Sequence, residues 1–258
     1  MRRLATVSLA LARRAARNSL RRPQFLAPLV VFPSLFLAVN TGGLHRTTDL
    51  PGFPHVHGFL DFQLAGAITQ SLLLGGISQG IAAALEIEGG FFDRLAAAPI
   101  PRVAIVIGRL GATAVIAVVQ IVYFLVLGLV FGAHVAGGPA GALVALAVGV
   151  VAGVGFGALG IALALRARSA ATIQGIFPLV FVILFVSSAF FPRGLLESPI
   201  DTIARYNPLS YVANGMRSPI IDAVHAAPSL EGLAAGAGVT VVACALAVAA
   251  LRGRLREA

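Results

Sequence analysis

The segment from Leu85 to Arg102, LEIEGGFFDRLAAAPIPR, gathers charged and aromatic side chains between two long apolar runs. The charged residues before its prolines are Glu86, Glu88, Asp93 and Arg94. Phe91, Phe92 and Leu95 have the spacing that brings side chains together on one face of a short helix. Aromatic rings offer large apolar area for few rotatable bonds, and nearby charges orient a partner. We therefore interpret residues 86–102 as a charged knob with an exposed aromatic anchor for another protein.

Glycines and prolines delimit this knob. Gly89 and Gly90 interrupt the preceding apolar run, and Pro99 and Pro101 end the short helix predicted from Phe91 onward. The alternative interpretation, which the pattern leaves equally open, is a loop whose phenylalanine rings dip into a membrane interface.

Other reactive residues carry weaker signals. His55 and His57 have a spacing that could supply two metal ligands, but no cysteine and few acids accompany them, so a structural role is favoured and no metal is predicted. The sequence contains no Ser-His-Asp arrangement and no G-x-S-x-G motif, so we predict no catalytic residue. Cys244 lies in an apolar run and is interpreted as a small buried hydrophobe.

The basic residues exclude one enzyme class. All 19 are arginine, and a P-loop needs a lysine on the nucleotide phosphates. The chain therefore cannot hold a standard Walker A motif, and we predict that it is not an ATPase by itself and carries no cofactor.

The composition is that of a membrane protein. Of 258 residues, 58% are hydrophobic and 11% charged, whereas about 25% of residues are charged in soluble domains. Mean hydropathy is +0.94. The net charge of +9 could suggest nucleic acid as a partner, but the arginines lie between apolar segments and form no charged face. We predict no nucleic-acid binding.

The apolar segments predict an all-α integral membrane protein. A spanning helix needs roughly 20 mainly apolar residues. We predict a transmembrane domain over 23–254 with six spans, at about 24–44, 62–85, 103–131, 141–165, 170–191 and 233–251.

The arginines orient these spans. With the N-terminus in the cytoplasm, 15 arginines lie inside, and only Arg46, Arg193, Arg205 and Arg217 lie outside. Because arginine accumulates on the cytoplasmic side, we predict cytoplasmic termini, a cytoplasmic knob and external histidines. The bias toward Ala, Gly, Val and Arg favours a bacterial host, so we predict a location in the bacterial plasma membrane.

Two further segments have distinct patterns. Residues 1–22 form an amphipathic segment, with Leu4, Val7 and Leu11 at helical spacing and arginines on another face. We predict an interfacial helix contacting lipid headgroups, with a simple topology anchor as the alternative. Its lipid-facing arginines are Arg14, Arg17 and Arg21.

Glycines in the fourth span predict close helix packing. Gly149, Gly153 and Gly157 recur every fourth residue, which lets a neighbouring helix approach closely.

The predicted spans hold almost no ionisable side chains. Secondary transporters usually keep carboxylates inside the membrane for ion coupling. Here Asp61 lies at an edge and Arg109 near a cytoplasmic end, so any transport must take its energy from elsewhere. We predict a path for an amphiphile, lined by apolar residues of spans one, two and five.

Two segments of the chain resemble those of a known family. GGFFDRLAAAPIPR after span two is similar to the coupling segment of type-2 ABC exporter permeases, and RYNPLSYVANGMR before the last span to their Asn-Pro-Leu stretch. The nearest group is the daunorubicin and antibiotic-resistance permeases. The resemblance implies an external re-entrant helical hairpin over 192–228. Its carried-over residues are Asn207, Pro208, Leu209, Tyr211 and Arg217.

The resemblance also implies partners. It implies two permease copies, as a homodimer or with a related permease, and two copies of a separate ATPase that binds ATP and Mg. The knob would be the coupling helix seated on that ATPase. The implied activity is export of a hydrophobic or amphiphilic drug, antibiotic, lipid or glycolipid. An ion-coupled secondary transporter and a metal-dependent ectoenzyme using the external histidines are the alternatives.

Overall fold

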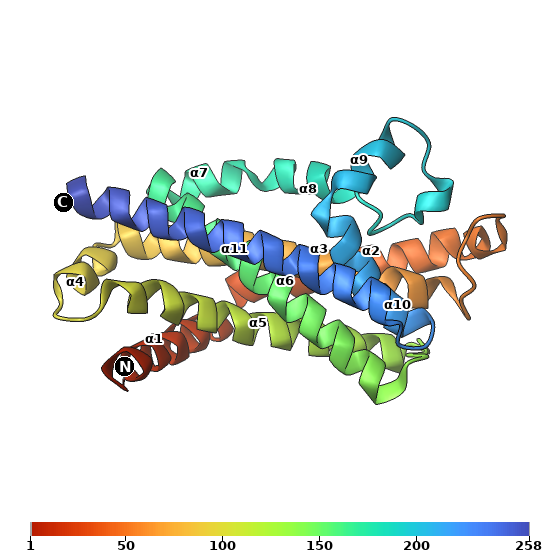
Figure 1. The fold of residues 1–258 in the computed structure, drawn as a ribbon, viewed down its shortest axis with the longest axis horizontal. Coiled ribbons are helices and arrows are strands. Elements are labelled where there is room, and N and C mark those ends of the chain that lie inside the picture. Colours follow the sequence, from red (N-terminus) through yellow and green to blue (C-terminus); the bar gives the residue numbers. More distant parts are fainter. Residues whose placement is uncertain (1, 258) are drawn as a thin grey trace.

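The computed structural model describes residues 2–257, without the side chains of residues 2, 3, 25, 93, 96, 102 and 255–257. Within that range every regular element is a helix (Figure 1). The elements are α1 (Arg2–Leu20), α2 (Pro23–Leu44), η1 (His45–Asp49), α3 (Phe59–Glu88), α4 (Phe91–Ala97), α5 (Arg102–Val130), α6 (Gly138–Ala167), α7 (Ala170–Gly175), α8 (Phe177–Phe185), η2 (Arg193–Leu195), α9 (Ile200–Tyr206), α10 (Pro208–Ile221) and α11 (Ala226–Glu257).

Five helices in the described range are long and apolar enough to cross a membrane: α2, α3, α5, α6 and α11. The predicted fifth span, 170–191, differs, because it is divided at Ile176 into the short helices α7 and α8. Pro178 sits in the first turn of α8, where its missing N–H needs no partner from α7. Length and hydropathy therefore support five of the six predicted spans. The remaining one, the fifth, is a broken apolar helix over Ala170–Phe185.

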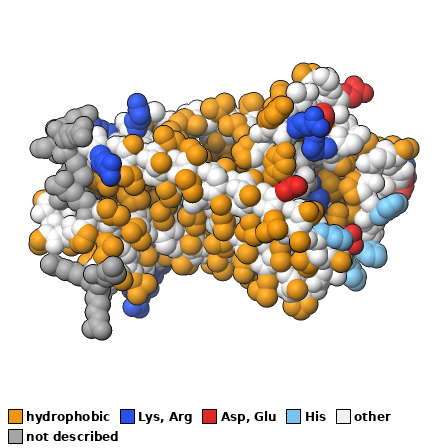
Figure 2. Space-filling view, viewed as in Figure 1, with side chains coloured by type: hydrophobic (Ala, Val, Ile, Leu, Met, Phe, Trp, Pro, Cys, Tyr) orange, Lys and Arg blue, Asp and Glu red, His pale blue; other side chains and the backbone are white. Residues whose placement is uncertain are grey.

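The two ends of the bundle differ in charge. Both termini, α4 and the α6–α7 turn lie at one end, and the loop after η1, α9 and the α10–α11 turn lie at the other (Figure 1). Figure 2 shows arginines at both ends on this face, histidines and acids at the end opposite the termini, and a band of hydrophobic side chains between the two ends. The structure thus places the histidine-rich loops and the termini at opposite ends.

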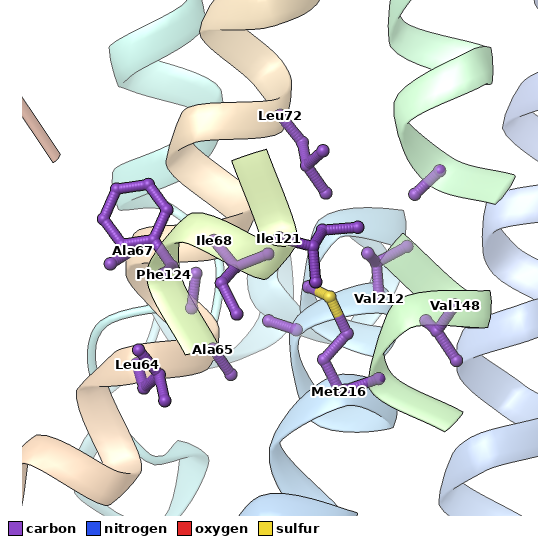
Figure 3. Close-up of a cluster of buried hydrophobic side chains, with 14 of the residues drawn as sticks. Leu64, Ala65, Ala67, Ile68, Leu72, Ile121, Phe124, Val148, Val212 and Met216 are labelled. Atoms are coloured by element: carbon purple, nitrogen blue, oxygen red, sulfur yellow. The ribbon is translucent and has the colours of Figure 1, made fainter. Parts of the chain in front are cut away.

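The core forms around α3. In an 18-residue apolar window of this helix 78% of the residues are buried, which explains why apolar residues lie on every side of it. Its side chains meet those of α5, α6 and α10 near the end opposite the termini (Figure 3). The main contributors are Leu64, Ile68 and Leu72 of α3, Ile121 and Phe124 of α5, Val148 of α6, and Val212 and Met216 of α10.

The glycine stripe of α6 packs on α5 of the same chain. A Cβ added at Gly149 would lie 2.7 Å from the Cδ1 of Ile121, and one at Gly153 would lie 2.8 Å from the Cβ of Ala117. At Gly157 an added Cβ would clash with Thr113. The four-residue spacing of the glycines therefore matches a four-residue spacing on α5, and the backbones approach closely here.

Candidate functional site

The short helix α4 is folded back on the bundle. Gly90 has a φ of 67°, a left-handed conformation that glycine adopts without steric strain, and it turns the chain sharply out of α3. Extended backbone at Ala98 ends the helix just before Pro99. The result is a seven-residue helix at the end of the molecule that holds both termini.

Phe92 corrects the expectation of an exposed aromatic anchor. Its side chain is only 4% exposed and packs into a cluster with Ile87, Ile105 and Leu165. Leu95 packs partly buried against the same cluster. The ring therefore joins α4 to α3, α5 and α6 and is not available to a partner in this conformation. The i, i+3 spacing that suggested an exposed patch equally fits a helix lying on its own core.

Arginines from both terminal helices cover the two rings. The guanidinium of Arg14 in α1 lies 3.7 Å from the centre of the Phe91 ring. The guanidinium of Arg254 in α11 lies 4.8 Å from the centre of the Phe92 ring. Cation–π contacts of this kind are attractive within about 6 Å. Helix α4 is thus held at once by α1 and α11, so a displacement of α4 reaches both terminal helices.

The two glutamates of the knob also bond within the chain. Glu86 forms an ion pair with Arg109 of α5. Glu88 accepts a hydrogen bond of 2.9 Å from the backbone N–H of Ala170, at the start of α7. These carboxylates therefore connect α3 to α5 and to α7. This role differs from the predicted one, in which the charges orient a partner protein.

The exposed surface of the knob includes Arg94 and its neighbours. Arg94, Ala97 and Pro99 are exposed at the end of the bundle. The side chain of Asp93 lies outside the described residues. Of the predicted coupling residues with described side chains, Glu88 and Arg94 are the exposed charged ones, and Glu88 is bonded to Ala170.

Helix α1 lies along α5. A Cβ added at Gly108 of α5 would lie 2.6 Å from the Cβ of Leu11, so the two helices touch closely. Arg14, Arg17 and Arg21 are exposed, and together with Arg13 they line an open groove of about 580 Å³. The predicted arginine face thus exists as a basic surface, while the Leu11 side of α1 packs on protein.

Asn207 ties the junction of α9 and α10 to α8. Its side-chain oxygen accepts a hydrogen bond from the backbone N–H of Leu209, which caps α10. Its side-chain amide donates 2.8 Å to the carbonyl of Ile183 in α8. Pro208 fills the first helical position, and the hydroxyl of Tyr211 donates 2.9 Å to the carbonyl of Arg205. The Asn-Pro-Leu stretch is therefore a helix start anchored to the broken helix.

Arg217 is a buried cation, although it was predicted on the external hairpin. Its guanidinium donates 3.1 Å to the carbonyl of Phe62 and 3.0 Å to that of Ser188, and it also bonds Ala189 and Asn214. It lies 3.8 Å from the centre of the Phe62 ring. Burial lowers the pKa of Arg217 to about 9, so it stays protonated at neutral pH. The residue holds α3, α10 and the chain after α8 together.

A lateral cleft of about 570 Å³ opens between α2, α3 and the α7–α8 pair. The sequence predicts a substrate path along these elements, which are spans one, two and five, but it does not indicate which residues line the path. The floor is α3, and the lining is apolar apart from Gln24, Ser78 and Gln174. Representative lining residues are Pro28 and Leu29 of α2, Leu74 and Ile77 of α3, and Gln174 and Phe177 of α7 and α8.

Phenylalanine rings join α2 to α8 beyond this cleft. The rings of Phe32 and Phe181 are 5.3 Å apart, and those of Phe36 and Phe190 are 4.7 Å apart. Phe185 adds a contact of 6.0 Å with Phe36. Phe32 and Phe36 are four residues apart, as are Phe181 and Phe185, so each pair shares one helix face. Nothing in the sequence indicates that the two faces meet.

The histidine-rich end shows one ring pair. The rings of His57 and His134 are 5.6 Å apart, and Asp61 accepts a hydrogen bond of 2.9 Å from the backbone N–H of His134. Among the described residues, no three His, Cys, Asp or Glu side chains come together as a metal site would require. Asp61 is buried in the first turn of α3, which fixes the loop that carries His134.

Comparison with known proteins gives a consistent result. A family described as ABC-2 type transporter matches residues 6–221. The transport permease ycf38 of Porphyra purpurea is 28% identical over 205 residues, covering 76% of this chain and 68% of that protein. The daunorubicin resistance ABC transporter permease protein DrrB1 of Streptomyces coeruleorubidus is 26% identical over 200 residues, with the same coverage of 76% and 68%.

Proposed function

This chain belongs to the ABC-2 type transporter family, and from that premise we propose that it is the permease subunit of an ATP-driven exporter. The observation that carries the proposal is the family match over residues 6–221, which includes α4, α9 and α10. The protein is a multi-pass membrane protein, and its family consists of transporter membrane subunits. The finer points below, namely span number, partners, direction and substrate, are proposals.

We propose six crossings with cytoplasmic termini. Both termini lie at the same end of the bundle, which requires an even number of passages along its length (Figure 1). Five helices are long enough to cross, and the α7–α8 pair supplies the sixth passage. The excess of arginine at the end with the termini supports the cytoplasmic assignment.

A separate ATPase, present in two copies with ATP and Mg bound, would supply the energy. The lack of lysine in this chain supports a separate subunit. Helix α4 is the proposed contact, because it lies at the end of the bundle that holds the termini and exposes Arg94. Force on α4 would pass through Phe92 into the core and through Phe91 and Arg14 into α1.

The substrate would be a hydrophobic or amphiphilic molecule. The lateral cleft supports this, because its lining is almost entirely apolar and lies against the side of the bundle, where a lipid-like molecule could enter. A second copy of the permease would face α2 and α8, where large apolar side chains such as Val31, Leu35 and Val182 are exposed. The name of the Streptomyces relative favours a drug or antibiotic as cargo.

Coupled ATP hydrolysis tests the proposal. The ATPase of the same operon, or a matched homologue, is added to liposomes that contain the full-length permease. We expect the hydrolysis rate to rise in the presence of permease and to rise again with a hydrophobic drug such as daunorubicin. A rate that ignores both the permease and every hydrophobic drug, with transport that follows an ion gradient alone, would assign the chain to a secondary transporter.

A further inference from the structure

Two glutamines in α3 are buried without hydrogen-bond partners. Gln63 is 1% exposed and Gln70 is 0% exposed. Within the described part of the chain, neither the amide nitrogen nor the amide oxygen of either residue has a partner. Buried side-chain polar groups are nearly always paired, and an unpaired one destabilises a protein by about 1–3 kcal/mol. Four unpaired atoms on one helix therefore need an explanation beyond stability.

Both glutamines lie on the face of α3 that forms the floor of the cleft. Positions 63, 70, 74, 77 and 81 are separated by seven, four, three and four residues, which returns to the same side of an α-helix. Leu74, Ile77 and Ile81 line the cleft. Gln70 and Gln63 thus continue that floor, one and three turns farther toward the histidine-rich end.

The phenylalanine contacts bracket these glutamines. Leu74, one helical turn after Gln70 in the sequence, packs in a cluster with Leu29 and Phe181. A Cβ added at Gly66, which lies between the two glutamines, would be 3.2 Å from the Phe190 ring and 2.5 Å from the carbonyl of Ala189. The stretch of α3 that carries the glutamines is therefore covered by α8 and by the chain that follows it.

A third unpaired group lies beside this stretch. Ser188, next to Ala189, is 1% exposed, and its hydroxyl has no hydrogen-bond partner among the described residues. No carboxylate or basic side chain occurs on the α3 face at positions 63, 70, 74, 77 or 81. The α3 face itself offers amides and apolar side chains. The nearby guanidinium of Arg217 already donates to the carbonyls of Phe62, Ser188 and Ala189.

We propose that Gln63 and Gln70 bind the headgroup of the cargo, and that this headgroup is uncharged and rich in hydroxyl or amide groups. The apolar body would occupy the cleft, while the head would exchange hydrogen bonds with Gln70 and then Gln63 once α2 and α8 separate. An amide both donates and accepts, so it pairs with a hydroxyl of either polarity. A cationic head would find no carboxylate on this face. An anionic head would meet only the guanidinium of Arg217, most of whose donors are already engaged, and would lose its hydration without full compensation.

This inference rests on the proposed function, and the test separates the two. The complete complex of permease and ATPase is placed in liposomes with three fluorescent probes that share one diacylglycerol body. Their heads are glucose, the fully O-methylated glucose ether, and phosphate. Equilibrium binding of the same probes to the permease alone in nanodiscs gives a second readout that needs no ATPase.

The variants are Gln70→Leu and Gln63→Leu, with Gln79→Leu as the matched control. Gln79 is a buried glutamine of the same helix, but it lies on another face and donates to the hydroxyl of Ser19. We expect the wild type to prefer the glucose head over its ether by about tenfold, the effect of one hydrogen bond of about 1.4 kcal/mol. Gln70→Leu and Gln63→Leu should remove most of that preference, whereas Gln79→Leu should keep it.

Thermal unfolding distinguishes recognition from a structural role. Because leucine removes an unpaired polar group, the midpoint of Gln70→Leu should stay the same or rise while the preference falls. A preference that persists in both variants, or a phosphate head bound more tightly than glucose, would overturn the assignment. A wild-type complex that moves no probe would refute the proposed transport, and the binding readout would still decide on the glutamines.

Discussion

Replacing Phe92 by alanine should destabilise the permease itself. The ring is 4% exposed and fills space between Ile87, Ile105 and Leu165, so its loss leaves a cavity in the bundle. Buried Phe→Ala changes cost about 3–5 kcal/mol, and loss of the contact with Arg254 removes a cation–π attraction of about 0.5–1 kcal/mol. For a chain of this size these figures correspond to a fall in the unfolding midpoint on the order of 10 °C.

Arg94→Ala is the contrasting variant for this prediction. Arg94 is exposed, so its replacement should leave the free energy of unfolding within about 0.5 kcal/mol of the wild type. It should still weaken association with the ATPase, most clearly at low salt, because an exposed interface charge acts mainly on the association rate.

The assay compares thermal unfolding of purified permease in nanodiscs with co-purification of the ATPase at low and high salt. We expect Phe92→Ala to lower the midpoint and Arg94→Ala to lower only ATPase capture. If Phe92→Ala unfolds at the wild-type temperature yet fails to bind the ATPase, the ring contacts the partner directly, and the structural reasoning for α4 is wrong.

Further variants test the hairpin, the helix packing and the topology. Arg217→Ala leaves several buried carbonyls unpaired and should lower stability by on the order of 3 kcal/mol in denaturant unfolding, whereas a neutral effect would refute the role of this cation as a clamp. Asn207→Ala should cost about 1 kcal/mol through the lost helix cap, measured in the same way. Gly157→Leu should prevent close packing of α5 on α6 and reduce folded protein in size-exclusion chromatography, and normal yield would contradict the contact. A cysteine placed at His57 should react with a membrane-impermeant reagent in intact cells and one placed at Arg94 should not, and the reverse pattern would invert the orientation.

The long helices could be predicted from sequence because hydrophobic length alone specifies them. The predicted span 103–131 corresponds to α5, and 141–165 lies within α6. The break at Ile176 was not predicted. Pro178 lies within an apolar run, and membrane helices tolerate proline, so its presence does not by itself distinguish a continuous helix from two short ones.

The site was predictable in location and only partly in geometry. The glycines and prolines around 91–97 define α4, but whether Phe92 faces a partner or its own core depends on helices far away in the sequence. Arg217 illustrates the same limit, because a buried arginine is stabilised by the carbonyls of Phe62 and Ser188, and nothing in the local pattern indicates those partners. Gln63 and Gln70 were overlooked because uncharged amides in an apolar span carry no periodic signal of their own.

ATP-driven extrusion in inside-out vesicles tests the central claim most directly. Vesicles that contain the permease together with its ATPase receive daunorubicin outside, and drug uptake into the lumen is followed by fluorescence quenching. The account predicts uptake that requires ATP hydrolysis and both proteins and that persists when ion gradients are collapsed. Uptake by the permease alone, driven by an ion gradient and indifferent to ATP, would contradict it.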